Sequence, residues 1–253
     1  MMLCIIRIRC LLALMLILFV GNVFALPAKV IILRHGEKST STGPSGIYGL
    51  CSIGWERSLA LSSTYLGKGA VDTLLPKNGP AAFFALTPHT IELASPAAVS
   101  WGAELQNYSV VALPSDLQTS AQLTTQLVVR TQEAATDVMK NPKWNNKVVV
   151  IVWEHEYIAN SKIEKEATGK VTLRQLLNLD QIAGDPVPKD WEDDNYDFFW
   201  IVEYGKRSSK IPTRFTAIKQ SYPGTGIPSN DWGVWVALPQ DCENSSPPST
   251  ISN

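Results

Sequence analysis

The stretch KVVVIVWEHE, residues 147–156, carries the strongest structural signal in the sequence. After its first residue it is apolar on both faces, which is typical of a central strand in a parallel sheet, and it then stops abruptly at polar residues. Lys29–Leu33 has the same character and ends at Arg34-His35-Gly36, and 81–86 ends at Thr87-Pro88-His89. The three histidines of the chain therefore each follow a predicted buried strand.

Helical patterns alternate with these strands and indicate the fold class. Two further strands are predicted at Val110–Leu113 and Phe198–Glu203, and a polar loop at 39–49. The predicted helices cover Trp55–Leu66, a short segment ending at Ala94, Ser120–Met139 and Val171–Leu179. This alternation predicts an α/β fold, a three-layer α/β/α sandwich with a mostly parallel central sheet. In such sheets ligands bind beyond the carboxyl ends of the strands, where the histidines are expected.

Composition fits one globular domain, which we expect to span residues 26–243. The chain has 253 residues, of which 45% are hydrophobic and 18% charged. Its formal net charge of −1 gives no basic surface for a nucleic-acid backbone, so nucleic acid is not an expected partner.

The N-terminus has the pattern of a secretory signal peptide. The apolar run Leu11–Val20 follows Arg7 and Arg9 and precedes Val23-Phe24-Ala25, which predicts cleavage after Ala25. An uncleaved membrane anchor is the alternative, but this run is short of the roughly 20 residues that a spanning helix needs. We therefore expect a signal peptide at residues 1–25, and a secreted protein that is not attached to a membrane after cleavage.

The C-terminal end and the cysteines bear on the mature protein. Residues 244–253 are rich in Ser and Pro and are expected to be a disordered tail. Cys4 and Cys10 lie in the predicted signal, which leaves Cys51 and Cys242. In an oxidising compartment these two could pair. Two buried free thiols are an equal alternative, because a sequence does not report the distance between two Cα atoms.

Three motifs resemble the histidine phosphatase superfamily, whose members are phosphoglycerate mutase-like. Arg34-His35-Gly36-Glu37 after a buried strand resembles the family signature. Leu50, Gly54 and Arg57 are similar to its Leu-x-x-x-Gly-x-x-Arg element, and VVVIVWEHE resembles the strand that carries the second family histidine. The resemblance implies a phosphomonoesterase that works through a phosphohistidine intermediate, needs no cofactor, and takes a small phosphate ester as its partner.

The resemblance also implies roles for individual residues. His35 is the expected nucleophile, since an unprotonated imidazole attacks phosphorus at neutral pH. Arg34 and Arg57 match the family's phosphate clamp, in which guanidinium groups offer forked donors to oxygen anions. His155 matches the histidine that donates a hydrogen bond to the phosphoryl oxygens, and Glu37 is expected to orient its loop.

A leaving oxygen needs a proton, and two glutamates are candidates for the general acid. Glu156 follows His155 directly, a placement similar to that in the acid-phosphatase branch of the family, and is the first choice. Glu92, on the turn after His89, is the alternative.

The sequence departs from the family pattern at one pocket position. Where the family carries a second arginine, TPHTIELA places His89, and an alignment through Ser95-Pro96 places Val99. Neither offers a guanidinium, although a protonated His89 could bind phosphate at acidic pH. A second interpretation therefore stays open, in which the protein is a weak or inactive relative that binds phosphate ligands as a secreted binding or effector protein.

Other reaction classes are disfavoured. The three histidines could hold zinc, but Arg34 and Arg57 would repel a cation, so no metal is predicted. No Gly-x-Ser-x-Gly element is present for a serine hydrolase. The predicted signal peptide argues against a glycolytic mutase, whose substrates are cytosolic. The identity of the substrate and the oligomeric state are not indicated.

Overall fold

The computed structural model describes residues 26–40, 49–110, 118–205, 209–229 and 237–242. The predicted signal peptide, the predicted tail and residues 111–113 lie outside these ranges. Within them, no helix combines the length and the apolar character that crossing a membrane requires.

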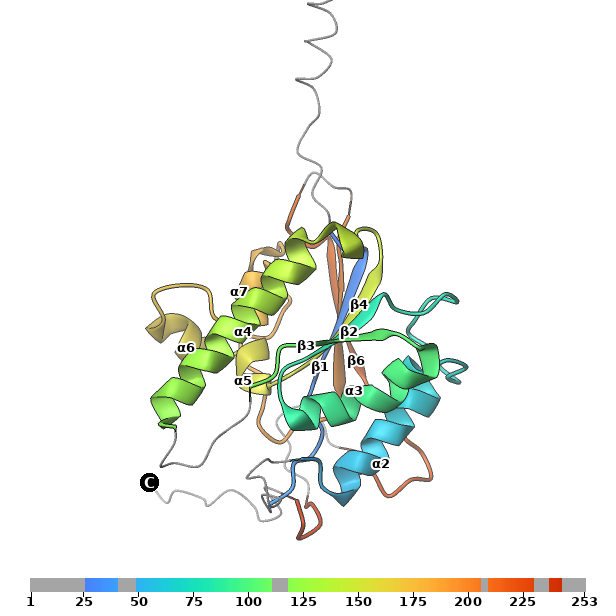
Figure 1. Ribbon diagram of the computed structural model, residues 1–253. Helices are drawn as coiled ribbons and strands as arrows, with labels where there is room; N and C mark the ends of the chain where they lie inside the picture. Colours follow the sequence, from blue (N-terminus) through green and yellow to red (C-terminus); the bar gives the residue numbers. More distant parts are fainter. Residues whose placement is uncertain (1–25, 41–48, 111–117, 206–208, 230–236, 243–253) are drawn as a thin grey trace, which may run out of the picture.

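A six-stranded sheet forms the centre of the fold (Figure 1). Along the sheet the strands follow the order β3-β2-β4-β1-β5-β6. The pairs β3/β2, β2/β4 and β4/β1 are parallel, whereas the pairs β1/β5 and β5/β6 are antiparallel. The predicted, mostly parallel sheet is thereby confirmed. The strands are β1 Lys29–Arg34, β2 Ala82–Ala85, β3 Glu104–Asn107, β4 Val148–Trp153, β5 Phe198–Glu203 and β6 Arg214–Lys219.

Helices cover both faces of this sheet. Figure 1 shows α2 and α3 on one side and α4, α5 and α7 on the other. The helices are α2 Ser52–Leu61, α3 Pro88–Trp101, α4 Ser120–Lys140, α5 His155–Ile158, α6 Ser161–Glu166 and α7 Leu173–Leu176. A π-helical turn, Ser62–Leu66, follows α2, and 3-10 turns occupy Pro142–Trp144 and Leu179–Gln181.

The side chains of the central strands alternate between two apolar cores. In β1, Val30 and Ile32 belong to the core under α4, whereas Ile31 and Leu33 belong to the core under α2 and α3. Strand β4 divides in the same way. Because successive side chains in a strand point to opposite faces, a strand that is apolar at every position must be covered on both sides. This confirms the predicted three-layer sandwich.

Helix α3 is longer than the sequence pattern predicts. The prediction ended it at Ala94, but it continues through Pro96 to Trp101. A proline inside a helix leaves the carbonyl four residues earlier without its usual donor. Here the Glu92 carbonyl accepts a hydrogen bond from the Ser58 hydroxyl of α2 at 3.0 Å. A contact from a helix distant in sequence thus lets α3 continue past the proline.

Three other predictions of secondary structure need correction. The third strand lies at Glu104–Asn107, and Val110, where the prediction began it, is outside any strand. Strand β6 was not predicted. The helix predicted over Val171–Leu179 is only four residues long, because Asn178 has a left-handed backbone, with φ of 58°, and separates it from the following 3-10 turn.

A disulfide joins Cys51 and Cys242, with their Cα atoms 5.2 Å apart. Cys51 directly precedes α2, and its amide donates to the Glu37 carbonyl at 2.9 Å. Cys242 forms a β-bridge with Ser39. Of the two alternatives left open by the sequence, the structure contains the paired cysteines. The disulfide lies beside the segment that follows β1.

Candidate active site

The strand register brings the three histidines together. Arg34 at the end of β1 is paired with Trp153 at the end of β4, so His35 and Glu154 leave the sheet side by side. His89 lies in the first turn of α3, just after β2, which neighbours β4. The ring centre of His35 is 4.9 Å from that of His89 and 5.4 Å from that of His155. The expected meeting of the histidines at one edge of the sheet is confirmed.

His35 is fully buried and held in one orientation. Its Nδ1 is 2.7 Å from the Gly36 carbonyl oxygen, which can only accept, so Nδ1 carries the proton in this contact. Its Nε2 lies 3.1 Å from Arg34 Nη2 and 3.2 Å from His155 Nδ1. Burial lowers the pKa of His35 well below its ordinary value, and Arg34 adds to this. The imidazole is therefore neutral, with the lone pair of Nε2 directed into the site.

Arg34 is held by main-chain oxygens. Its Nη1 donates to the carbonyls of Glu192, Asp193 and Asn195 at 3.0, 2.5 and 3.3 Å. Its guanidinium carbon also lies 4.0 Å from the centre of the Tyr196 ring, a cation–π contact. Burial lowers the pKa of Arg34, but an arginine stays charged at any working pH. A fixed cation thus lies beside Nε2 of His35.

His155 is oriented by Asp193. Its Nε2 lies 2.9 Å from the Asp193 carboxylate, an acceptor, so this nitrogen carries a proton and Nδ1 faces His35. Burial, with a further contribution from Arg34, lowers the pKa of His155 to about 4. At neutral pH both imidazoles are neutral, and their unprotonated nitrogens face the same space.

Arg57 is enclosed by acceptors. It makes a buried ion pair with Glu37, at 2.6 Å, and another with Asp197, at 2.8 Å. Its remaining donors reach Gln220 at 3.4 Å and the Pro228 carbonyl at 3.3 Å. Burial alone would lower the pKa of Arg57, but Glu37 and Asp197 raise it above the ordinary value. A phosphate contact by Arg57 stays a prediction, and it requires one of these bonds to be exchanged.

Close packing explains why Gly54 follows Leu50 in the second motif. A Cβ at Gly54 would lie 2.3 Å from the Glu37 carbonyl oxygen, and one at Gly36 would lie 3.0 Å from Leu50 Cδ2. Helix α2 therefore packs directly on the segment that carries His35. In this way the motif keeps Glu37 within reach of Arg57.

Glu154 is a member of the site that the sequence did not single out. One of its oxygens contacts His89 Nε2 and accepts from the Thr87 hydroxyl at 2.7 Å, and the other lies 3.5 Å from His35 Nε2. The carboxylate is largely buried, with 12% of the side chain exposed. Its position directly before His155 was the available signal. Asp193 was also missed, because a loop far along the chain carries no pattern that ties it to His155.

The two predicted general acids are placed differently. Glu156 lies in α5 and is exposed as a whole residue. Its carboxyl group is nevertheless partly shielded from water, and this shielding, together with the charges of Asp193 and Glu154, raises its pKa above the ordinary value. Glu92 accepts a hydrogen bond from the Leu50 amide at 2.6 Å, so its carboxylate is engaged in holding that loop.

A cation is poorly suited to the histidine cluster. His35, Glu154 and His155 offer three possible ligand atoms within 4.8 Å of one another. However, Arg34 Nη2 is 3.1 Å from the same nitrogen of His35 that would bind the ion. Because a guanidinium at this distance repels a cation, we assign no metal to these residues.

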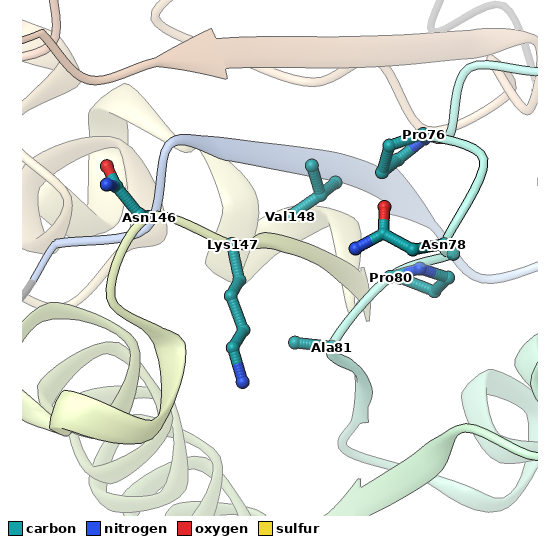
Figure 2. A pocket seen from close by; sticks show the side chains of 8 residues that line it. Pro76, Asn78, Pro80, Ala81, Asn146, Lys147 and Val148 are labelled. Carbon is teal, nitrogen blue, oxygen red and sulfur yellow. The ribbon is translucent and has the colours of Figure 1, made fainter.

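A cavity of about 380 Å³ lies at the other end of the strands, where β2 and β4 begin (Figure 2). It is formed by the loop before β2, including Asn78, and the turn before β4, including Lys147. Strand β4 has six residues, so its two ends are about 17 Å apart. The cavity is therefore separate from the histidine site.

Comparison with known proteins gives fold likeness at low identity. No protein-family model and no curated protein matches the sequence. Among solved structures, mycobacterial glucosyl-3-phosphoglycerate phosphatase is similar, with 14% identity, 76% of this chain and 98% of that chain covered, and a TM-score of 0.44. The same enzyme in complex with VO3 gives 15% identity, the same coverage and a TM-score of 0.43. A protein described as mycobacterial hydrolase 1 gives 13% identity, 80% and 100% coverage, and a TM-score of 0.43.

Proposed function

We propose that this protein hydrolyses small phosphate monoesters through a phosphohistidine formed on His35. The observation that carries the proposal is the environment of His35 Nε2. This nitrogen is unprotonated, because Nδ1 donates to the Gly36 carbonyl, and it lies 3.1 Å from a fixed guanidinium. A neutral nucleophile beside a buried cation is the combination that attack on an anionic phosphoryl group needs.

His155 would gain a proton when phosphate arrives. In the unliganded site its pKa is about 4, since burial and Arg34 oppose a second proton. A phosphate dianion next to Nδ1 favours the imidazolium, because an opposite charge stabilises the charged form. Asp193 already accepts from Nε2 at 2.9 Å and would hold the imidazolium in place. His155 then donates from Nδ1 to a phosphoryl oxygen, the role that the family resemblance implies.

Charge balance favours phosphate binding in acid. Arg57 is offset by Glu37 and Asp197, so Arg34 is the principal cation left for the ligand. Against it stands the buried carboxylate of Glu154, which lies 3.5 Å from His35 Nε2. Protonation of His155 adds a second cation beside the ligand, and we expect phosphate affinity to rise as the pH falls below neutral.

The test compares the wild type with His35→Ala on p-nitrophenyl phosphate between pH 4 and pH 8. Hydrolysis that disappears in the variant supports the proposal, and acid-labile labelling of the wild type by a phosphorylated substrate identifies the intermediate. Glu133→Gln, a change in an exposed ion pair, serves as the control variant and should keep full activity. The proposal is rejected if the wild type and His35→Ala show the same background rate.

A second candidate is a weak or inactive relative that binds phosphate ligands. The feature that favours it is His89, which stands where the family resemblance calls for an arginine and is paired with the Glu154 carboxylate. In that case inorganic phosphate or vanadate would raise the unfolding temperature of the wild type, while neither the wild type nor His35→Ala would turn over an ester.

We also propose that the protein acts outside the cytoplasm, as a domain of residues 26–243. The apolar run Leu11–Val20 and its flanking residues support export. The disulfide between Cys51 and Cys242 agrees with an oxidising compartment. N-terminal sequencing of protein recovered from the culture medium should begin at Leu26.

A further inference from the structure

A buried polar cluster beside His35 has so far been given no part in bond breaking or proton transfer. Glu154 lies at its centre, in contact with His89 Nε2 and 2.7 Å from the Thr87 hydroxyl. The Thr87 oxygen is also 2.9 Å from His89 Nε2. Only 8% of the His89 side chain and 12% of the Glu154 side chain are exposed. These groups are therefore fixed in position and shielded from bulk water.

An anionic carboxylate at this place hinders the binding of a phosphate dianion. Burying a charge is also costly unless the charge is paired, so a pairing with His89 keeps the carboxylate in the site. Burial raises the pKa of Glu154, but His89 and His35 hold it well below the ordinary value. The other charged groups that act on it include Lys38. In the step proposed below, this pair carries one dissociable proton, shared between His89 Nε2 and the Glu154 oxygen that it contacts.

We propose that the His89–Glu154 pair is the general acid that protonates the leaving oxygen. The inference rests on the proposed function, because it assigns a further step of the same reaction. Its basis is position: a Glu154 oxygen is 3.5 Å from His35 Nε2, the atom that would bond to phosphorus. A phosphoryl group bonded to Nε2, and the ester oxygen attached to it, would therefore lie within hydrogen-bonding reach of the pair.

The proton balance of both half-reactions closes with this pair. In the first, the Nε2–P bond forms, the ester P–O bond breaks, and the leaving oxygen takes the proton, which leaves neutral His89 and anionic Glu154. In the second, water loses a proton to the pair as its oxygen attacks phosphorus and the Nε2–P bond breaks. Inorganic phosphate is released, and the pair holds one proton again.

The two glutamates nominated by sequence are less well placed for this step. Glu92 is bound by the Leu50 amide at 2.6 Å. Glu156 is an exposed residue of α5 with no hydrogen bond or ion pair to His35 in the described part of the chain, although its raised pKa keeps it the main competitor. Glu154 and Glu156 are the same residue type on either side of His155, and they therefore form a matched pair for an experiment.

The experiment compares two substrates whose leaving groups differ in their need for a proton. p-Nitrophenolate leaves without protonation, whereas the alkoxide of glycerol 2-phosphate does not. We expect Glu154→Gln to lower kcat/KM for glycerol 2-phosphate by about 10²- to 10⁴-fold, the usual contribution of a general acid, and to affect p-nitrophenyl phosphate far less. Glu156→Gln should affect the two substrates equally. If Glu154→Gln does not fold, as judged by its unfolding transition, His89→Gln provides the same test.

The outcomes separate this inference from the proposed function. Equal losses on both substrates in a folded Glu154→Gln variant overturn the inference, as does a selective loss on glycerol 2-phosphate in Glu156→Gln. Either result leaves the proposed function intact if His35→Ala is inactive on p-nitrophenyl phosphate. Activity that does not depend on His35 rejects the proposed function, and the role of the pair with it.

Discussion

His155 should make the folded protein less stable in acid. Burial, with Arg34, lowers its pKa from 6.5 to about 4, whereas the unfolded chain keeps the ordinary value. Between these two pH values the unfolded state binds more protons than the folded state, so the free energy of unfolding falls as the pH falls. The full effect is about 3 kcal/mol, of which about 2 kcal/mol appears between pH 7 and pH 4.5.

The perturbation that isolates this effect is His155→Gln, which removes the titrating group. Urea unfolding of the wild type and the variant at both pH values gives the loss of stability of each protein. The pKa of His35 is also lowered, but that contribution is present in both proteins and cancels in the comparison. The wild type should lose about 2 kcal/mol more than His155→Gln.

Nuclear magnetic resonance provides an independent measurement. The ring protons of His155 should titrate with a midpoint near pH 4 in the folded protein. The reasoning is refuted if the midpoint lies near the ordinary value, or if His155→Gln loses as much stability as the wild type. The exposed substitution Glu133→Gln is the control and should leave the pH dependence of the wild type unchanged.

Two further predictions concern stability. Glu37→Gln breaks a buried ion pair with Arg57 and should lower the free energy of unfolding by about 3 to 5 kcal/mol. Glu133→Gln, in an exposed pair, should cost less than about 1 kcal/mol in the same urea experiment, and similar losses for the two variants would contradict this contrast. Replacing Cys51 and Cys242 by serine removes a bridge between residues 191 apart in sequence and should cost about 2 to 5 kcal/mol. A thiol titration of the unfolded, exported wild type should then find no free cysteine, and one or two reactive thiols would count against the bridge.

The sequence predicts the centre of the sheet better than its edges. Strands β1 and β4 are apolar on both faces, and this pattern has few alternatives. Strands β3 and β6 lie at the two edges of the sheet and are exposed or half-buried, so neither has the continuous apolar run that marks β1 and β4. Helix α3 passes Pro96 because Ser58 supplies a hydrogen bond from α2. No local pattern contains that information.

The site divides in a similar way. The meeting of the three histidines could be predicted, since each follows one of three strands expected to be parallel, and the carboxyl ends of parallel strands lie at the same end of the sheet. The groups that set the protonation of these histidines could not be predicted. The carbonyls that bind Arg34 begin at Glu192, which is 158 residues after Arg34 in the sequence. Asp193 lies in the same loop, and only folding brings this loop to the site. Glu154 is adjacent to His155 in sequence, but the direction of its side chain depends on where β4 ends, and a sequence does not give that boundary to the residue.

The loop that contains Glu192 and Asn195 binds Arg34 through backbone carbonyls, and this has a consequence for sequence variation. Carbonyl oxygens are common to all residues, so Glu192 could be exchanged for another residue without loss of its contact with Arg34. The length of the loop is a different matter, because inserting or deleting one residue would move all three acceptors at once. Among related chains, this segment should therefore be free in composition but fixed in spacing, and alignments that tolerate gaps there would misplace Asp193.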